Sequence, residues 1–327
     1  MVVGLGAVGT RAARQLLACD HVERLTVLAR RPKRVAAAAL ALGPRVELRE
    51  GGPGDLADDA SLVVFAMPSG LKAGLAAAIA VGAHAAASTD DPEEVRDALE
   101  MDAEARRAGI TAVLGAAMAP GLSGLLASFC ARRLDRVSEV HVASLGTGGP
   151  LCARRHHAAL SSLATDFDEG AWRRRPGGSG RELLWFPEPV GGADCYRAGL
   201  ADPALLVPAF PGVQRVTARL HGTRRDRMTA WLPMLRPPHP EGTVGAVRAE
   251  VRGWRGASAA TVVMGAVAPP GLAAGTVAAV VALWACAGDL ARPGVGGVAE
   301  MVPDPGRFLR HLAERGIQVS EFDGGVI

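Results

Sequence analysis

The sequence predicts an α/β protein with a doubly wound parallel sheet and a second region of α+β character. Over the first 125 residues, short apolar runs alternate with helical patterns, as expected when helices connect the strands of a parallel sheet. Beyond about residue 125, strand-like runs are separated by glycine- and proline-rich segments. The length of 327 residues also suits two domains. We therefore expect one domain over 1–125 and a second domain of α+β character after it.

The first region contains five expected strands and three expected helices. The third helix has the clearest start: Asp91 can cap it, Pro92 suits its first turn and Glu94 can close a capping box. Its pattern continues to about residue 107 and ends at Gly109. The expected strands are 2–3, 25–29, 45–49, 61–66 and 110–114, and the expected helices are 10–18, 71–81 and 91–107.

The second region is expected to contain a helix over 125–133, then strands at 137–144, 182–186, 213–220 and 244–251. Helices over 275–287 and 305–315 complete the chain. The stretch 257–288 is apolar enough to resemble a membrane span, but Pro269, Pro270 and Gly271 divide it. We therefore expect a buried helix and no membrane partner.

The composition excludes some classes of protein. A net charge of +3 and a single Tyr leave few groups for binding and stacking nucleic acid, so we expect no such partner. The five cysteines are scattered, odd in number and without CxxC spacing, which predicts reduced thiols and a cytoplasmic chain. The apolar start is interrupted by glycines, so we expect no signal peptide.

The first motif that carries chemistry is Gly4-Leu5-Gly6-Ala7-Val8-Gly9, which matches GxGxxG. Gly4 permits a tight turn, Gly6 lets the backbone approach a pyrophosphate, and Gly9 lets the helix pack on the strand. Ala7 and Val8 begin a helix whose free N–H groups can bind phosphate. The motif lies between a strand and a helix, which predicts a Rossmann dinucleotide-binding domain. Only three residues precede Gly4, so the first strand is very short or the protein starts upstream.

The end of the second expected strand predicts which dinucleotide is bound. NAD enzymes usually have an acidic residue there for the ribose 2′-hydroxyl. This chain has Arg30 and Arg31 instead, followed by Lys33 and Arg34. Arginine can bind a 2′-phosphate through two hydrogen bonds. We therefore expect NADP in preference to NAD, although a solvated basic turn would have the same sequence.

Residues after the later strands are expected to line the same site, because ligands bind at the carboxyl ends of parallel strands. Ala66, Met67 and Pro68 follow the fourth strand. Ser88 lies in the next loop, and Met118 precedes the Pro120-Gly121 pair. We assign all five to cofactor binding, with ordinary packing as the alternative for Met67.

Four segments together resemble the saccharopine dehydrogenase-like NAD(P)-dependent reductases. The first is the GxGxxG motif, and the second is AVGAH at 80–84 followed by Ser88-Thr89-Asp90. The third is ARRAGITAVLGAAMAPG at 105–121, and the fourth spans RELLWFPEPVG and FPGVQRV within 181–216. Ala85 and Ala87 depart from the family, which often has Tyr and Asp there. The resemblance implies a Rossmann domain built from both chain ends, with 1–125 completed by about 265–327. It also implies that residues 126–264 form an inserted α+β substrate and dimerisation domain. It also favours a homodimer.

Candidate catalytic and substrate-binding residues are polar groups near the expected sheet edge or in the second region. His156 and His157 suit proton transfer near neutral pH, although adjacent helical residues point in different directions. Lys72 is a further proton donor if it is buried, and otherwise a solvated residue. Arg154, Arg155 and Arg181 suit a substrate carboxylate. The polar cluster at 152–157 lacks a repeated ligand pattern, so we expect no metal.

The leading hypothesis is therefore an NADP-dependent oxidoreductase. The resemblance implies that it reduces or oxidises a C–N bond in a small amino-acid-like imine or secondary amine, with a carboxylate on the substrate. One alternative is an NADP-dependent C=O or C=C reductase of secondary metabolism. A second is a catalytically inactive NADP-binding sensor or scaffold, which the alanines at 85 and 87 keep open.

Overall fold

Seven parallel strands form the first sheet of the computed structural model, which describes residues 1–234 and 237–322. Their order is β15-β6-β5-β4-β1-β2-β3, so the chain moves from β1 to one edge and then returns to build the other. The last position is taken by β15, which comes from the C-terminal part of the chain. The strands are β1 (Val2–Val3), β2 (Leu25–Ala29), β3 (Val46–Glu50), β4 (Leu62–Phe65), β5 (His84–Ala87), β6 (Thr111–Leu114) and β15 (Gly294–Gly297).

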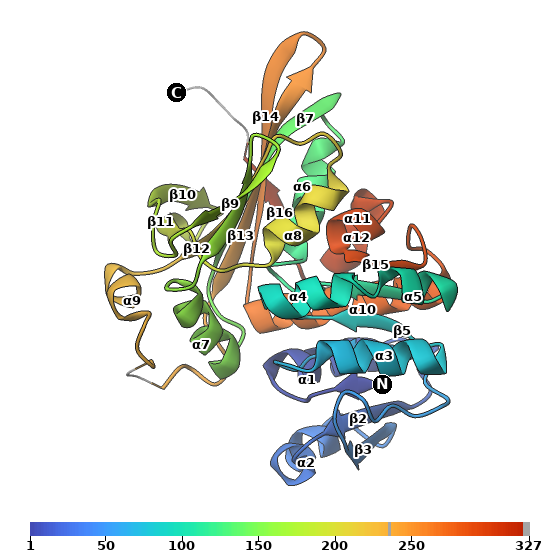
Figure 1. Cartoon of the computed structure of the whole chain (residues 1–327). Helices are drawn as coiled ribbons and strands as arrows, with labels where there is room; N and C mark the ends of the chain where they lie inside the picture. Colours follow the sequence, from blue (N-terminus) through green and yellow to red (C-terminus); the bar gives the residue numbers. More distant parts are fainter. Residues whose placement is uncertain (235–236, 323–327) are drawn as a thin grey trace.

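Helices cover both faces of this sheet, which confirms the doubly wound α/β class (Figure 1). On one face, α1 (Ala7–Leu17) packs against α10 (Pro270–Ala287). On the other face lie α3 (Leu71–Val81), α4 (Pro92–Leu99) and α5 (Asp102–Arg107). Burial of these apolar faces on both sides is the main force that holds such a sheet together.

The second sheet has nine strands and mixed directions. Strands β7 and β12 are parallel, and β13 pairs antiparallel with both β7 and β14. Helix α6 (Leu122–Ala131) packs on one face of β7, β13 and β14. The strands are β7 (Arg136–Leu145), β8 (Ala164–Asp168), β9 (Ala171–Arg175), β10 (Glu182–Phe186), β11 (Gly191–Tyr196), β12 (Arg215–His221), β13 (Gly245–Arg255), β14 (Ser258–Ala268) and β16 (Val319–Glu321).

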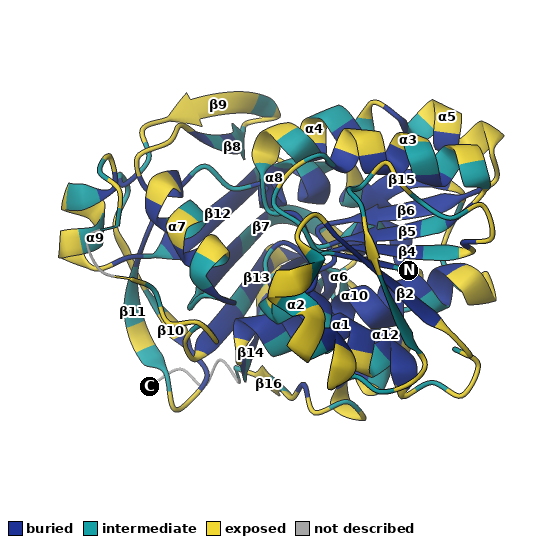
Figure 2. Ribbon diagram, turned by 90° about the horizontal axis from the view of Figure 1, so that it is seen from below, coloured by how far each residue is buried: buried dark blue, intermediate teal, exposed yellow. Residues whose placement is uncertain are grey.

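The remaining helices lie around the two sheets. Figure 2 shows the inner strands of the first sheet buried and the outer elements β9 and α9 largely exposed, whereas the edge strand β3 has no buried residue. The helices that lie around the two sheets are α2 (Pro32–Leu40), α7 (Pro150–Ala159), α8 (Asp202–Leu206), α9 (Arg224–Thr229), α11 (Val298–Met301) and α12 (Pro305–Ala313).

Several predicted boundaries are wrong. The helix expected over 91–107 is two helices, α4 and α5, with a break at residues 100–101. Asp91 does cap α4, accepting from the N–H groups of Glu93 and Glu94. Helices α1 and α6 begin three residues earlier than expected, because glycine-initiated first turns lack the polar caps that mark a start in the sequence. Helix α2 and strand β5 were not predicted.

The C-terminal part of the chain contributes to both sheets. Strand β15 joins the first sheet, whereas β16 pairs with β14 in the second. The predicted first domain extends to residue 327, and its residues 323–327 lie outside the described part. The division into domains at 125 and 264 stays a prediction.

Helix α10 is long and apolar enough to cross a membrane by length and composition, yet 78% of it is buried inside the structure. Its small residues allow close packing on α1: a Cβ on Gly275 would lie 2.6 Å from the Cβ of Arg11. This burial is that of a core helix, as predicted. The helix begins at Pro270, five residues earlier than expected, with Pro269 as its N-cap.

Candidate functional site

The turn between β1 and α1 requires glycine at two of its three motif positions. Gly4 has φ +92°, and a Cβ there would lie 2.6 Å from the Ala66 carbonyl oxygen. A Cβ on Gly9 would lie 1.9 Å from the Gly4 carbonyl oxygen. These two residues therefore bring α1 directly against the ends of β1 and β4.

Gly6 differs, because a Cβ placed on it would meet nothing within 4 Å. Gly6 precedes the first turn of α1, which contains no acidic side chain. The open space in front of it is where N–H groups and the positive end of the helix dipole point. The turn thus fits a pyrophosphate, which a side chain at this position would displace.

Two cavities extend from this turn in opposite directions. One has a volume of about 500 Å³ and lies over the ends of β1 and β2. The other, of about 310 Å³, lies between the first sheet and α7. Both are lined by Gly6, by Ala66, Met67 and Pro68, and by Leu151. Together they form one elongated groove that crosses the point where the strand order reverses, which is where dinucleotides bind in such sheets.

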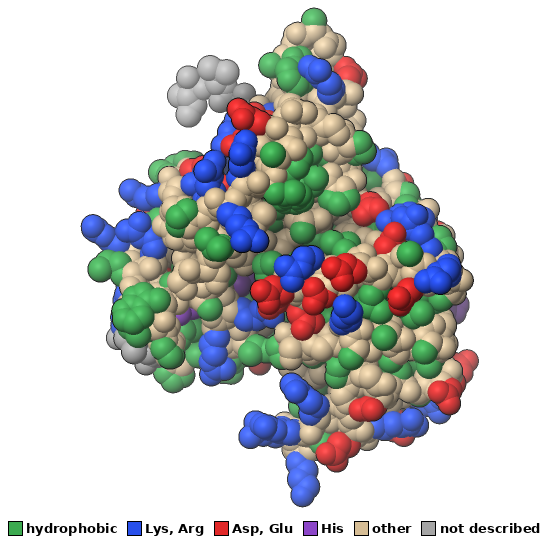
Figure 3. Space-filling view, viewed as in Figure 1, with side chains coloured by type: hydrophobic (Ala, Val, Ile, Leu, Met, Phe, Trp, Pro, Cys, Tyr) green, Lys and Arg blue, Asp and Glu red, His purple; other side chains and the backbone are tan. Residues whose placement is uncertain are grey.

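The larger cavity is lined by Arg30, Arg31 and Arg34, and no carboxylate lines it. Arg30 and Arg31 are exposed and follow directly after β2. Figure 3 shows Lys and Arg side chains projecting from the end of the molecule that holds α2. This end of the groove therefore favours an anionic ligand group.

The smaller cavity brings together residues from both parts of the chain. Ala7, Val8, Ser88 and Met118 come from the first region. The opposite wall is formed by the end of β7, the following glycine loop and α7, including Cys152, Arg154, Arg155 and His156. Pro150 occupies the first turn of α7, where its fixed φ favours the helix start.

His156 lies in a polar cluster on the cavity wall. Its Nε2 is 3.6 Å from Cys152 Sγ, one helical turn earlier, and 3.7 Å from Asp90 Oδ2. Burial lowers the pKa of His156, but Cys152, Asp90 and the Gly146 carbonyl outweigh it and raise the pKa to about 9. His156 is therefore protonated at neutral pH and can donate a proton into the cavity.

Arg155 is bound to the first sheet rather than free. Its Nε is 2.9 Å from Asp90 Oδ1, its Nη2 is 2.8 Å from Asp91 Oδ2, and its Nη1 donates to the Pro68 carbonyl at 3.1 Å. Arg154, one residue earlier, is exposed at the cavity and has no ion pair within the described residues. Arg154 is thus the guanidinium that remains free for a substrate anion.

The donor atoms of Asp90, Cys152 and His156 lie within 4.8 Å of one another, a spacing that a metal ion would accept. However, Asp90 already binds the Arg155 guanidinium, and the protonated His156 is a second cation beside it. We therefore describe the group as a polar cluster in which His156 contacts Cys152 and Asp90 pairs with Arg155.

Four predicted site residues do not line the groove. Lys72 is 60% exposed on α3 and lies 3.8 Å from Glu100. His157 is buried, with its Nε2 2.9 Å from the Thr229 carbonyl oxygen. Arg181 is 66% exposed and pairs with Asp194 at 2.9 Å. Gly9 acts only by permitting the close helix–strand contact. Lys72, His157 and Arg181 therefore lie outside the groove, and their chemical roles stay predictions.

The sequence analysis missed Asp90, Cys152 and Arg34 as site residues. Asp90 follows β5, a strand of small residues that was not predicted from the sequence. Cys152 stands one helical turn before His156, so the i,i+4 spacing could have paired them. Arg34 belongs to the same basic stretch as Arg30.

No family model matches the chain, and a search of curated proteins also finds no match. Solved structures do match. Saccharopine dehydrogenase (L-Glu forming) from Saccharomyces cerevisiae has a TM-score of 0.70 and 14% identity, covering 98% of this chain and 99% of that one. Homospermidine synthase from Legionella pneumophila, in complex with NAD, has a TM-score of 0.69 and 13% identity, covering 98% and 91%. Amine dehydrogenase from Mycobacterium smegmatis has a TM-score of 0.53 and 15% identity, covering 93% and 97%. The chain therefore shares the fold that its motifs predicted.

Proposed function

We propose that the protein is an NADP-dependent oxidoreductase that acts on a C–N bond of a small, carboxylate-bearing substrate. The observation that carries this proposal is the continuous groove, with arginines at one end, the Gly6 turn in the middle and the His156 cluster at the other. The names of the structures that share the fold, two amino-acid or amine dehydrogenases and a polyamine synthase, support this reaction class.

The residues of the groove divide into two sets. Arg30, Arg31 and Arg34 would bind the 2′-phosphate, and the first turn of α1 would bind the pyrophosphate. A bound nicotinamide supplies or accepts the hydride. The surrounding residues Met67, Ser88 and Met118 would limit the access of water to that end of the groove.

Two residues of α7 would act on the substrate. The protonated His156 would donate its proton to the substrate nitrogen as a C=N bond is reduced, and take it back in the reverse direction. Arg154 would bind the substrate carboxylate from the open side of the cavity. Asp90 and Cys152 would hold the imidazolium in place.

The choice of NADP depends on this chain's own arginines, because the homospermidine synthase structure holds NAD. Arg30→Ala should weaken NADPH binding about tenfold or more, since charge-assisted hydrogen bonds contribute about 1.5–3 kcal/mol. NADH binding should change little. Lys33→Ala, in the same exposed stretch but not lining the cavity, is the matched control. Fluorescence titration measures both affinities, and tighter binding of NADH than NADPH by the native protein would contradict the assignment.

The reaction class is tested by NADPH oxidation with two substrate panels. Mixtures of amines with keto acids should support turnover, whereas simple ketones and enones should not. Turnover with ketones or enones alone would favour the carbonyl or alkene reductase. Tight NADPH binding without turnover in either panel would favour the non-catalytic sensor.

A further inference from the structure

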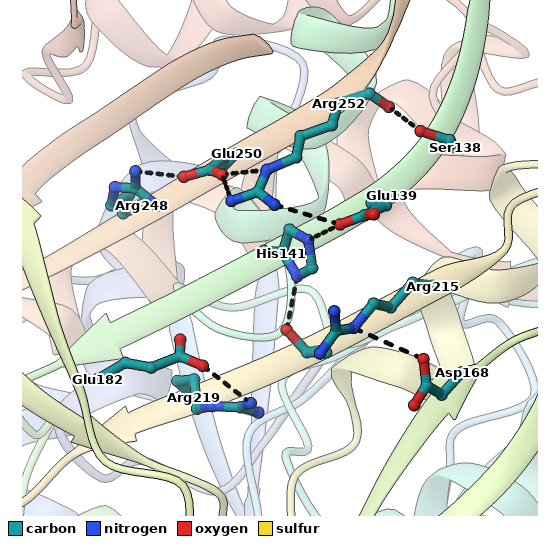
Figure 4. Close-up of polar contacts among 11 residues, drawn as sticks. Ser138, Glu139, His141, Asp168, Glu182, Arg215, Arg219, Arg248, Glu250 and Arg252 are labelled. Carbon is teal, nitrogen blue, oxygen red and sulfur yellow. Dashed lines mark hydrogen bonds and ion pairs between the residues drawn. The ribbon is translucent and has the colours of Figure 1, made fainter.

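A second polar cavity lies on the face of the second sheet opposite α6. It is formed by side chains that alternate along three neighbouring strands, β12, β7 and β13 (Figure 4). The strand register places Arg219 and Arg248 on either side of Ala143, and Thr217 and Glu250 on either side of His141. The small side chain of Ala143 therefore leaves a gap between two arginines.

The sheet is curved around this gap. The edge strand β10 reaches across to β13 and β14, and its Glu182 and Leu184 form the cavity's other wall. The cavity has a volume of about 160 Å³ and shares no lining residue with the cofactor groove. It is thus a separate polar cavity, with room for a small group only.

The cavity contains unpaired hydrogen-bond donors. In residues 1–234 and 237–322, six buried side-chain nitrogen or oxygen atoms have no hydrogen-bond partner. Three of these six are the Nε atoms of Arg215, Arg219 and Arg248, which all line this one cavity. Buried donors without partners are rare because they lose their hydration. Their concentration here indicates that an acceptor is required.

Arg219 gives the strongest evidence that this cavity binds an acceptor. Its side chain is only 2% exposed, but its nearest carboxylates are Glu182 at 3.4 Å and Asp166 at 3.6 Å. Asp166 is bound more closely by Arg197, at 2.9 Å. Arg219 Nη1 also donates to the Ala218 carbonyl oxygen at 3.2 Å. All of these contacts are longer than the about 2.7–2.9 Å of a short charge-assisted hydrogen bond, so the partners of Arg219 hold it loosely.

The neighbouring charges are better matched, which identifies where the anion is missing. Glu250 binds Arg248 at 2.5 Å through one oxygen and Arg252 through the other. Arg252 also reaches Glu139 at 3.4 Å. Among the lining residues, four arginines face two glutamates. Asp168, Asp166 and Glu139 pair with three of these arginines from outside the lining.

We propose that this cavity is a binding site for a compact oxyanion, a phosphate or carboxylate group, held above Ala143 by Arg219 and Arg248. Arg215, which is 42% exposed and pairs loosely with Asp168 at 3.7 Å, closes the outer side. The anion accepts from the Nε atoms of Arg219 and Arg248, which have no hydrogen-bond partner among the described residues. The site lies on the reverse face of β7, whose end lines the cofactor groove.

The test titrates the full chain with inorganic phosphate and, separately, with succinate, against sodium chloride at equal ionic strength. Isothermal titration calorimetry measures affinity and thermal unfolding measures stabilisation. Phosphate, succinate or both should bind with a saturable heat and raise Tm, whereas chloride should not. The anion that binds more tightly identifies whether the site takes a phosphate group or a carboxylate group. Equal effects of all three salts would overturn the proposal.

Variants locate the binding. Arg248→Gln and Arg215→Gln should each weaken it about tenfold or more, and both are less buried than Arg219, so folding should survive. Arg181→Gln removes an equal charge from outside the cavity and should leave the affinity unchanged. Native affinity in both Arg248→Gln and Arg215→Gln would exclude this site.

Phosphate can also occupy the turn at α1, so the titration is repeated with Gly6→Ala. Binding that survives in Gly6→Ala but weakens in Arg248→Gln supports the second site, whatever the outcome for NADPH. Binding that is lost in Gly6→Ala and kept in Arg248→Gln overturns it, and leaves the proposed cofactor site standing.

Discussion

Two adjacent histidines on α7 have different roles because they point in different directions. His156 faces the cavity beside Cys152 and Asp90, whereas His157 is buried with its Nε2 on the Thr229 carbonyl oxygen. The sequence predicted that only one of them faces the site. Only the orientation of α7 against the first sheet decides which one.

His156→Asn should lower kcat by about 10²- to 10⁴-fold, the usual contribution of a general acid, with little change in NADPH affinity. His157→Asn should keep its turnover and instead lower the free energy of unfolding by about 1 kcal/mol, through the lost hydrogen bond. For both variants, steady-state kinetics measures kcat and urea unfolding measures the free energy of unfolding. Equal, small kinetic effects would remove His156 from the mechanism.

The pH dependence follows from the same cluster. The pKa of His156 rises from 6.5 to about 9 on folding, so the fold stabilises the protonated form. That stabilisation is fully present below about pH 6.5 and is lost as pH rises through about 9. In the reductive direction, kcat/KM should therefore fall as pH passes about 9.

The variant Cys152→Ala tests this pH dependence, because Cys152 contributes most among the groups that raise the pKa of His156. Its pH–rate profile should fall at a lower pH than that of the native protein. Cys286→Ala, an exposed cysteine outside the groove, should keep the native profile. An unchanged profile in Cys152→Ala would show that another group donates the proton.

At the scale of elements, the β1–α1 turn uses its glycines for two purposes. Gly9 allows the helix to contact the strand, with no room for a Cβ, whereas Gly6 faces open space. The GxGxxG spacing alone predicted this division, because it depends on local backbone geometry.

Gly6→Ala should therefore fold normally and lose NADPH affinity, since its methyl group would fill the pyrophosphate space. Gly9→Ala should destabilise the fold by about 1–3 kcal/mol, as overpacking does. Thermal unfolding and cofactor titration separate the two effects. Full NADPH affinity in Gly6→Ala would mean that the pyrophosphate does not lie at this turn.

At the scale of the whole molecule, Arg155 joins the two parts of the chain. It lies on α7 and binds Asp90, Asp91 and the Pro68 carbonyl, all at the edge of the first sheet. The sequence predicted a substrate-binding arginine here, but the contacts assign it to holding the cavity wall in position. Arg154 is the neighbour left free.

Arg155→Gln should lower the free energy of unfolding by about 1–3 kcal/mol and speed hydrogen exchange over Pro150–Ala159. Arg154→Gln, which removes an exposed charge, should leave both unchanged and raise KM for an anionic substrate instead. Native exchange rates in Arg155→Gln would show that other contacts hold α7.

The sequence by itself determined the doubly wound class, the glycine turn and the basic end of the groove. Each depends on neighbouring residues: apolar periodicity within one element, positive φ at Gly4, or four cations in five positions after β2. The tertiary structure decided that His156 rather than His157 faces the cavity, and that Arg155 is bound to Asp90. It also assembled Glu139, Arg219 and Arg248 on one sheet face. These groups lie far apart in the chain, and only the register of β7, β12 and β13 brings their charges together.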